Sequence, residues 1–597
     1  MYRTHTLGQL NEKNIGEKVT LSGWVHRRRD HGGLIFIDLR DRYGMTQIVS
    51  DPTHNAETHA TTESMRSEFV IKAEGTVRMR PDGMENIKLV TGKIEVLIDT
   101  VEILNPAKTP PFEIEHPEEK EREVNEEIRL TYRYLDLRRE RMKNNIVMRH
   151  KTIKCMRDFF DNKQFLEIET PILVKGTPEG SREYIVPSRL YPAHFYVLPQ
   201  SPQQMKQLLM VAGMDRYFQI ARCFRDEDQR GDRQPEFTQL DIEMSFVTEK
   251  DIMDLNEELM IKLVETLVPH KKILKKPFPR ITWKEAMDRF GSDKPDMRFN
   301  MEICDVTEIV KSCSFQVFQN AIKSGGVVKA LKVEGGASFS RKEIDELTEL
   351  AKVYEAKGLA YITVEKEGPS GAIVKYFEKK ELDELLSTTE AKNGDIIFFG
   401  ADRYEIACTA LGYVRLACGD KMKLRNKDTY AFCWINEFPL FEYSKETKQL
   451  TASHHPFTSP LPDDRSMLKN SPEKVRAIAY DLAMNGSEVA GGSIRIHNSA
   501  LQSEIFDTLK ISKQDAERRF GHLLRAFQFG APPHGGIAWG IDRLIMLFQD
   551  EKNIREVIAF PKDQKAKDLM LGAPSELPDD QIAEMHIKIA QPQKEIL

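Results

Sequence analysis

The sequence predicts a multidomain α+β protein that begins with a small β-barrel, and three observations support this fold class. The chain has 597 residues, which at roughly 150 residues per domain corresponds to about three to five domains. Residues 1–104 have the pattern of a series of short strands. A later segment, 288–425, interrupts two stretches in which strands and helices are mixed.

Polar and apolar residues alternate along five short segments of the N-terminal region. The segments are 19–25, 34–39, 45–49, 69–77 and 94–98. Alternation with a period of two turns one face of each strand toward a core and the other toward water. Five such strands within about a hundred residues are typical of a small closed barrel.

The remaining boundaries follow changes in composition. Prolines and charged residues after the barrel indicate a hinge, and glycine-rich turns with a charged helix around 341–357 characterise the inserted segment. We expect a barrel at 1–104, a hinge at 105–140, a main domain in two parts at 141–287 and 426–566, an inserted domain at 288–425 and a C-terminal extension at 567–597.

Composition excludes several classes of protein. The 87 basic and 93 acidic residues leave a net charge of −6, so any nucleic-acid site must be a local patch. No apolar run is long enough to span a membrane and the N-terminus is polar, so we expect a cytoplasmic protein. The seven cysteines are odd in number and form no CxxC pair, which argues against disulfides and a cysteine-rich zinc site.

Two segments have the residues needed to hold phosphate. A strand over 216–228 carries Arg225 and leads through a turn-rich loop into a second strand, 236–246. Downstream, paired glycines precede Gly540 and Arg543, which open a predicted helix. Glycines let the backbone approach a ligand closely, a helix N-terminus favours anions, and arginine binds phosphate through two N–H groups.

Together these segments resemble the signature motifs of class II aminoacyl-tRNA synthetases. Phe224-Arg225-Asp226-Glu227 resembles motif 2, the segment from Gly536 to Arg543 resembles motif 3, and the segment from Phe165 to Pro171 resembles motif 1. All three occur in the family's order. Further segments are similar to the aspartyl-tRNA synthetase family, namely 177–180, 200–210, 234–241, 454–458 and 492–495. The resemblance covers nearly the whole chain.

The resemblance implies an OB-fold anticodon-binding barrel, an antiparallel catalytic sheet flanked by helices, and a homodimer formed through motif 1. It implies ATP and tRNA as substrates and Mg²⁺ as cofactor. Arg225 and Arg543 would be catalytic, gripping the α- and γ-phosphates. The implied ATP-binding residues are Arg225, Asp226, Glu227, Gln234, Glu488, Gly540, Ile541, Asp542 and Arg543, and the implied metal ligands are Asp481 and Glu488.

The amino-acid site can be approached from chemistry as well. An aspartate side chain requires fixed cations, and Lys206 and Arg495, assisted by His454, are the candidates. We expect Ser201 to cap a helix with Gln204 completing a capping box, which brings Gln203 and Lys206 onto one face. By the resemblance, Arg225 also contacts aspartate, and Glu179, Gln203 and Asp241 face its α-ammonium group.

One feature of the backbone needs explanation. Glu488 and Arg495 are seven residues apart, so simple alternation places them on opposite faces of one strand. A β-bulge at Gly491 and Gly492 would restore a common face. The family pattern has a third glycine where this chain has Ala490 and an aromatic residue where it has Ser487.

The basic patch of the barrel is the candidate tRNA surface. Barrels of this kind bind single strands through stacking aromatics and cations. The resemblance implies anticodon contacts from Arg27, Arg28, Arg29, His31, Phe36, Gln47 and Gly83. Some family members charge only aspartate tRNA and others also charge asparagine tRNA, and other members carry a leucine at the position of His31. Imidazole can donate or accept a hydrogen bond, which favours an enzyme that charges both aspartate and asparagine tRNAs.

Alternatives remain at this point. A strictly aspartate-tRNA-specific ligase is one, and a catalytically inactive tRNA-binding paralogue is another. Enzymes for lysine or asparagine are disfavoured because a lysine site needs carboxylates and a neutral amide needs no pair of cations. The inserted segment resembles the domain typical of bacterial-type members of the aspartate family.

Overall fold

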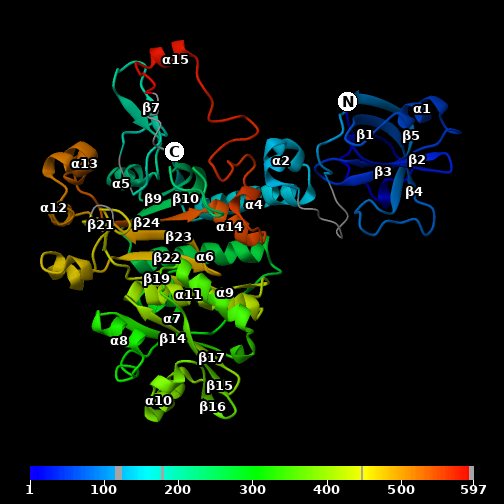
Figure 1. The fold of residues 1–597 in the computed structure, drawn as a ribbon. Coiled ribbons are helices and arrows are strands. Elements are labelled where there is room, and N and C mark those ends of the chain that lie inside the picture. The colour runs from blue at the N-terminus through cyan, green and yellow to red at the C-terminus, as the bar shows by residue number, and fades with distance from the viewer. Residues whose placement is uncertain (115–123, 177–179, 445–447, 591–597) are drawn as a thin grey trace. The chain divides into compact units, whose positions relative to one another are not determined.

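The computed structural model describes residues 1–114, 124–176, 180–444 and 448–590 (Figure 1). The chain divides into two compact units. Unit 1 comprises Met1–Val147 with Ala559–Asp563 and Lys567–Pro574, and unit 2 comprises the rest. Within the described residues, no helix is both long enough and apolar enough to cross a membrane. All seven cysteines are free thiols.

Unit 1 contains the predicted barrel. Its strands close in the order β1-β2-β3-β5-β4. The bounds are β1 (Lys18–His31), β2 (Leu34–Arg40), β3 (Met45–Ser50), β4 (Val70–Met79) and β5 (Ile94–Asn105), with helix α1 (Ala56–Glu63) between β3 and β4. Inward residues such as Val19, Leu21 and Ile37 are fully or almost fully buried. The five predicted strands are therefore confirmed, although several are longer than predicted.

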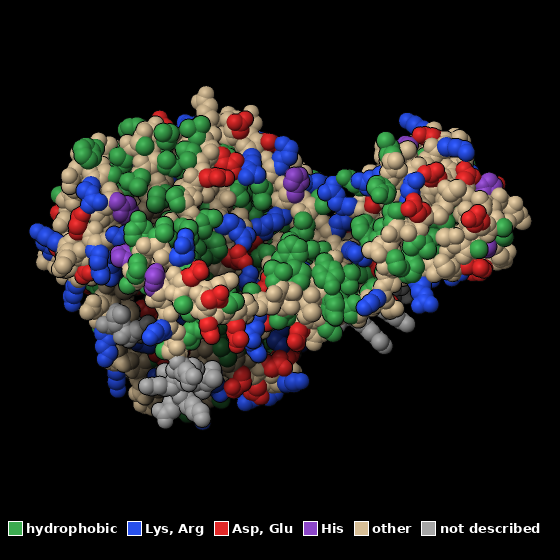
Figure 2. All heavy atoms as spheres, turned by 90° about the horizontal axis from the view of Figure 1, so that it is seen from above, with side chains coloured by type: hydrophobic (Ala, Val, Ile, Leu, Met, Phe, Trp, Pro, Cys, Tyr) green, Lys and Arg blue, Asp and Glu red, His purple; other side chains and the backbone are tan. Residues whose placement is uncertain are grey.

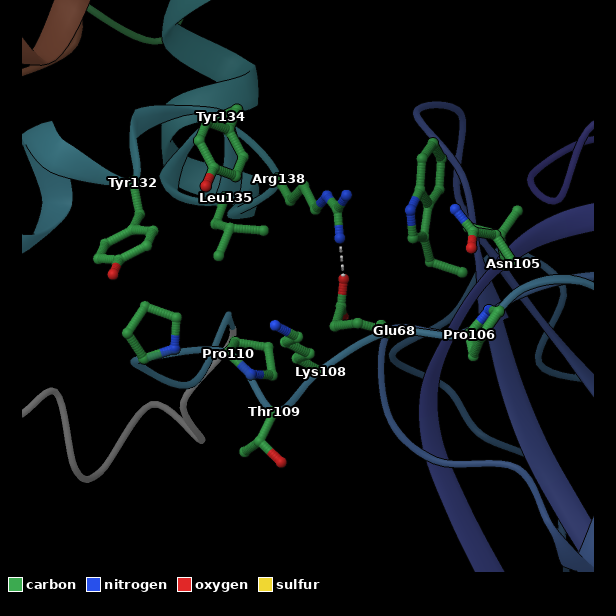
Figure 3. Close-up of a pocket in the computed structure, with 14 residues that line it drawn as sticks. Glu68, Asn105, Pro106, Lys108, Thr109, Pro110, Tyr132, Tyr134, Leu135 and Arg138 are labelled. Carbon is green, nitrogen blue, oxygen red and sulfur yellow. Dashed lines mark hydrogen bonds and ion pairs between the residues drawn. The ribbon is translucent and has the colours of Figure 1, made fainter. Parts of the chain in front are cut away.

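The rest of unit 1 is a helical segment after the barrel. It contains α2 (Glu126–Thr131), α3 (Arg133–Asp136) and the start of α4 (Glu140–Asn162). Arg138 pairs with Glu68 of the barrel at 2.7 Å, and its guanidinium lies 5.1 Å from the centre of the Trp24 ring. These side chains line a cavity of about 440 Å³ (Figure 3). This contact joins the segment after the barrel to the barrel itself.

Unit 2 is built on an eight-stranded sheet in the order β12-β19-β22-β23-β24-β10-β9-β6. Its neighbours are antiparallel except for the two edge pairs, β12 with β19 and β6 with β9. The bounds are β6 (Leu166–Glu167), β9 (Arg216–Phe224), β10 (Glu236–Ser245), β12 (Arg280–Thr282), β19 (Phe432–Asn436), β22 (Ala479–Met484), β23 (Ser487–Ile494) and β24 (His534–Gly540).

Helices cover this sheet. They are α4, α5 (Gln203–Val211), α6 (Glu249–Leu267), α7 (Trp283–Phe290), α12 (Ser499–Thr508) and α14 (Ile541–Phe548), and α13 (Lys513–Phe527) packs against α5 and α12. The main core joins Phe160 of α4, Leu240 and Ile242 of β10, Trp539 of β24 and Leu544 of α14. Because β10 alternates, its polar residues Asp241 and Glu243 turn away from that core. The sheet therefore has one apolar face and one face available for chemistry.

The inserted segment forms a second sheet, ordered β13-β14-β17-β15-β16. The strands are β13 (Ile303–Asp305), β14 (Val327–Val333), β15 (Ala360–Glu365), β16 (Gly368–Ser370) and β17 (Ile396–Asp402). The helices are α8 (Gln316–Lys323), α9 (Arg341–Val353), α10 (Lys379–Thr389) and α11 (Tyr404–Lys421). In Figure 1 this sheet lies beyond the β19 side of the eight-stranded sheet. The predicted charged helix is α9, which ends four residues earlier than expected.

Short pairs complete the chain. β7 (Ile185–Pro187) pairs with β8 (Phe195–Val197), β11 (Lys272–Ile273) with β18 (Thr429–Tyr430), and β20 (Phe441–Tyr443) with β21 (Leu450–Ala452), and the tail carries α15 (Asp579–Glu584). On the surface, acidic and basic side chains are interspersed across the face drawn in Figure 2, in line with the small net charge.

Candidate active site

Four buried charged side chains form the centre of the polar face. Lys206 of α5 approaches Asp241 at 2.6 Å and Glu243 at 3.3 Å. Arg495, just after β23, donates to both carboxylate oxygens of Glu243, at 3.0 and 3.2 Å. All four side chains are at most 3% exposed. The two predicted cations are thus brought together, and each already has a carboxylate partner.

Glu243 is a site residue that the sequence analysis did not name, although alternation along β10 placed it beside Asp241. Burial alone would raise the pKa of Glu243, but the positive charges of Arg495 and Lys206 outweigh it and lower that pKa below its ordinary value. Glu243 therefore stays ionised and holds the Arg495 guanidinium in place.

The two histidines before Pro456 differ in their surroundings. His455 Nε2 lies 2.7 Å from Arg495 Nη1, whereas the His454 ring packs edge-on against Phe438. Burial and the charge of Arg495 hold the pKa of His455 well below its usual value, so its ring is neutral. His455 is a contact that the sequence analysis missed, and the role of His454 stays a prediction.

The start of α5 differs from the expectation. Pro202 occupies the N-cap position and the helix begins at Gln203. Ser201 accepts from the Gln203 N–H at 3.3 Å, but the predicted capping box is wrong. Because the helix begins one residue later than expected, the Gln204 side chain does not reach the cap, and its amide atoms are buried without a partner among the described residues.

The segment that resembles motif 2 brings Arg225 to the end of β9. Its guanidinium lies 5.1 Å from the centre of the Phe237 ring. No hydrogen bond or ion pair from this guanidinium to another described residue is present, so its N–H groups are available to a ligand. In the loop that follows, Glu227 accepts from Ser181 at 2.6 Å and from Arg233 at 2.8 Å, Asp226 lies 3.4 Å from Arg182, and Gln234 is buried.

The segment that resembles motif 3 forms the junction of β24 and α14. A Cβ at Gly540 would meet only the Cβ of Arg543 within 4 Å, so the backbone is open there. Arg543 donates to the Glu488 carbonyl and pairs with Asp232 at 3.0 Å. The Ile541 side chain lies in the core, and Asp542 accepts from the Thr238 N–H at 2.9 Å. Any contact of those two residues with ATP would use the main chain.

The predicted metal carboxylates come together through a β-bulge. The register between β22 and β23 shifts where Leu482 faces Ala490 and Ala483 faces Glu488, which leaves Val489 as the extra residue. The expected bulge exists, but it lies at Val489 and not at the two glycines. A Cβ at Gly491 would lie 2.5 Å from Asp481 Oδ1 and 3.6 Å from Glu488 Oε1, so both carboxylates flank this glycine.

This pair of carboxylates suits a hard cation. Burial, followed by the negative charge of Glu488, raises the pKa of Asp481 well above its ordinary value. A divalent ion would relieve that repulsion. No cluster of three or more candidate metal ligands occurs in the part of the chain that the structure describes. Two carboxylates alone leave most of the coordination of Mg²⁺ to phosphates and water.

Glu179, which is predicted to contact the α-ammonium group of aspartate, lies outside the described residues.

Two of the predicted anticodon residues of the barrel, Arg29 and Gln47, lie in one polar network. Arg29 pairs with Asp38 at 2.7 Å and donates to Gln47 at 3.2 Å, and Gln47 donates to Glu95 at 2.8 Å. Glu95 also accepts from Arg78 at 2.8 Å, and neither Glu95 nor Arg78 is among the residues predicted from the sequence. Both lie on strands whose alternating polar residues cannot be distinguished in the sequence from an ordinary solvent-exposed face.

The other predicted anticodon residues are more exposed. Phe36 is half-buried between the fully buried Ile35 and Ile37, so its ring is directed out of the barrel core. His31 ends β1 and is exposed, as is Arg27, while Arg28 is partly buried. Gly83 has φ of +80°, and a Cβ there would meet nothing within 4 Å.

A barrel of the nucleic-acid-binding type, together with an antiparallel sheet whose polar face gathers arginines and carboxylates, defines a class of enzymes that join amino acids to tRNA. Residues 125–564 match the family described as tRNA synthetases class II (D, K and N), and residues 19–104 match the OB-fold nucleic acid binding domain. The chain belongs to the class II tRNA synthetases. The expected fold class is thereby confirmed.

The names of similar sequences also specify the amino acid. The chain is 52% identical to the aspartate–tRNA(Asp/Asn) ligase of Rubrobacter xylanophilus, covering 100% of this chain and 98% of the relative. It is 50% identical to the aspartate–tRNA ligase of Geobacillus kaustophilus over the full length of both chains. The asparaginyl-tRNA synthetase of Pyrococcus horikoshii, solved with asparaginyl-adenylate, has a TM-score of 0.58 at 19% identity, covering 94% and 98% of the two chains, which shows a shared fold.

Proposed function

We propose that the protein attaches L-aspartate to tRNA at the expense of ATP. The buried set around Lys206 and Arg495 carries this proposal. It offers two cations to a carboxylate side chain, while Asp241 Oδ2 is buried without a hydrogen-bond partner among the described residues and can accept from an ammonium group. The relatives named as aspartate–tRNA ligases, about half identical over the whole chain, support the same substrate.

The reaction has two steps. The aspartate α-carboxylate attacks the α-phosphorus of ATP, the bond to the β-phosphate breaks, and pyrophosphate leaves. A hydroxyl of the terminal tRNA ribose then attacks the acyl carbon of the adenylate, and AMP leaves with the bonding electron pair. Arg225 stabilises charge on the α-phosphate and Arg543 on the γ-phosphate. Lys206 and Arg495 orient the side chain, so catalysis rests on positioning and charge.

Asp481 and Glu488 would hold Mg²⁺, which would neutralise phosphate charge when bound. Gly540 and the backbone of Ile541 would border the nucleotide, with Glu227 and Gln234 on the other side.

A non-catalytic paralogue is disfavoured because Arg225, Arg543, Asp481 and Glu488 are all present. A lysine enzyme is disfavoured because the two carboxylates at the centre of the site, Asp241 and Glu243, are already paired with Lys206 and Arg495. We propose domain boundaries at 104, 140, 287, 425 and 566, as expected from composition.

The tRNA specificity rests on His31 and Gly83. We propose that the enzyme charges both aspartate and asparagine tRNAs, because His31 has an exposed imidazole and Gly83 has no side chain that could exclude either last anticodon base. Several relatives named as aspartate–tRNA(Asp/Asn) ligases support this choice.

We expect comparable charging of radiolabelled aspartate onto unmodified aspartate and asparagine tRNA transcripts. In His31→Leu, which loses a hydrogen-bonding group, charging of the asparagine transcript should fall about tenfold relative to the aspartate transcript. Charging of the aspartate transcript alone by the wild-type enzyme would establish the strictly specific ligase. Charging of neither would reject the proposed function.

We also propose a homodimer formed through the motif 1 segment. Strand β6 is an edge of the catalytic sheet, and Leu166, Ile172 and Leu173 in and after it are about half exposed. Exposed apolar side chains beside an open strand edge favour association with a second copy. Light scattering at micromolar concentration should give twice the chain mass of 68.7 kDa, and a monomer would contradict the proposal.

A further inference from the structure

A chain of buried hydrogen bonds runs from the amino-acid site to the start of β24. Gln203 Nε2 lies 3.0 Å from Gln207 Oε1, one turn further along α5. Gln207 Nε2 lies 3.1 Å from His534 Nε2, and His534 Nδ1 lies 2.7 Å from the Pro532 carbonyl. Gln203 is 6% exposed, and Gln207 and His534 are fully buried.

The Pro532 carbonyl, at the end of this hydrogen-bond network, determines which group donates and which accepts in every bond. A carbonyl oxygen can only accept, so His534 Nδ1 must carry the proton and donate to Pro532. In a neutral ring Nε2 is then an acceptor, and Gln207 must donate to it through its amide nitrogen. The Gln207 oxygen therefore faces Gln203, which must in turn donate through its own nitrogen. The Gln203 oxygen therefore points away from this hydrogen-bond network.

That remaining oxygen has the properties of a ligand contact. Gln203 Oε1 accepts no hydrogen bond from any residue that the structure describes. Asp241, which accepts from Lys206 through Oδ1, likewise has a buried Oδ2 to which no described residue donates a hydrogen bond. Two such acceptors match the donors of an α-ammonium group.

We propose that Gln207 and His534 are positioning residues, which orient the Gln203 amide so that its oxygen meets the α-ammonium of the bound amino acid. This inference rests on the proposed site for that ammonium group. If the amide were reversed, an NH₂ group would face the ammonium, and a favourable charge-assisted bond would be replaced by repulsion.

The surroundings of His534 agree with a neutral ring. Burial lowers the pKa of His534, and the nearby positive charge of Arg495 and the neighbouring His497 act in the same direction. Glu243 and the bond to Pro532 act against this shift without reversing it. The network therefore has one stable direction.

The test is aspartate-dependent ATP–pyrophosphate exchange by the full-length chain. Gln207→Met removes both bonds, and the KM for aspartate should rise about ten- to a hundredfold, with the KM for ATP little changed. Gln204→Met, which removes a buried glutamine of the same helix outside the network, is the matched control. Gln207→Glu keeps an oxygen that accepts from Gln203, and its other oxygen can accept from His534 when Nε2 carries a proton. Its KM for aspartate should therefore return most of the way from the Gln207→Met value to the wild-type value.

The rescue separates orientation from packing, because methionine and glutamate are both close to glutamine in size and differ in whether they can accept a hydrogen bond from Gln203. Gln207→Glu no better than Gln207→Met, or Gln207→Met indistinguishable from Gln204→Met, would overturn the proposal. If Gln207→Met does not fold, His534→Leu and His534→Gln test the same contrast, since only glutamine can supply an acceptor near Nε2. Wild-type protein without aspartate-dependent exchange would instead reject the proposed function itself.

Discussion

Arg225→Gln should lower kcat/KM for aspartate-dependent pyrophosphate exchange by about a thousandfold. The Arg225 guanidinium makes no hydrogen bond or ion pair with another described residue, so its role is to meet charge that a substrate brings. Removing one preorganised donor from a developing oxyanion typically costs a factor of about 10² to 10³, and arginine supplies a full charge besides. Glutamine retains a donor but no charge.

A control for this change lies on the same strand. Arg222 is exposed and pairs with Glu236 on the surface, three residues before Arg225. Arg222→Gln should leave exchange close to the wild-type rate and change the free energy of unfolding by no more than about 0.5 kcal/mol. Arg225→Gln should unfold at nearly the wild-type temperature. Exchange reduced less than tenfold in Arg225→Gln would show that another group stabilises the α-phosphate.

Arg495→Leu should raise the KM for aspartate by a factor of about 10² to 10³, because it removes a full positive charge and a charge-assisted contact with the substrate side chain. It should also destabilise the fold by about 3–5 kcal/mol, since Glu243 is left buried with Lys206 as its remaining cation. Chemical denaturation and steady-state exchange measure the two effects separately.

The pH dependence gives this prediction a sign. In the wild-type protein the pKa of Glu243 is lowered, so its contribution to stability is present above the unfolded pKa and is lost as pH falls. Without Arg495, burial should raise that pKa, and the folded protein should bind a proton more readily than the unfolded chain. The stability gap between wild type and Arg495→Leu should therefore widen as pH rises from about 5 to about 8.

Arg495→Lys serves as the conservative comparison, because lysine keeps the charge but not the fixed fork of donors. Its KM should lie between those of the wild type and Arg495→Leu. A KM for aspartate in Arg495→Leu within threefold of the wild-type value would contradict the assignment of Arg495 to the side chain.

Much of the fold could be predicted because local patterns and tertiary structure agree. The barrel strands alternate, and β10 has apolar Leu240 and Ile242 on one face and Asp241 and Glu243 on the other. Element ends were less predictable. Pro202 fits both the first helical position and the cap, so propensity does not decide between them, and α5 begins one residue later than expected.

In the site, residue types indicated chemistry but not pairing. Lys206 and Arg495 could be predicted as cations from their residue types. Their shared partner Glu243 becomes evident only in the folded sheet, where side chains of β10 and of the residues after β23 lie on the same face. His454 and His455 have the same side chain, and nothing in their order indicates which one reaches Arg495. The bulge was required by counting residues, but its location at Val489 depends on the partner strand β22.

The strands on either side of the inserted sheet have a consequence for how the chain folds. β12 pairs with β19, and β11 with β18, although roughly 150 residues separate the partners in each pair. Closing a flexible loop of that length costs entropy that grows only with the logarithm of loop length, about 0.6 kcal/mol for each doubling. If the inserted sheet forms first, its compact structure shortens the effective loop. The inserted segment would then act as a folding aid that speeds the joining of the two halves of the catalytic sheet.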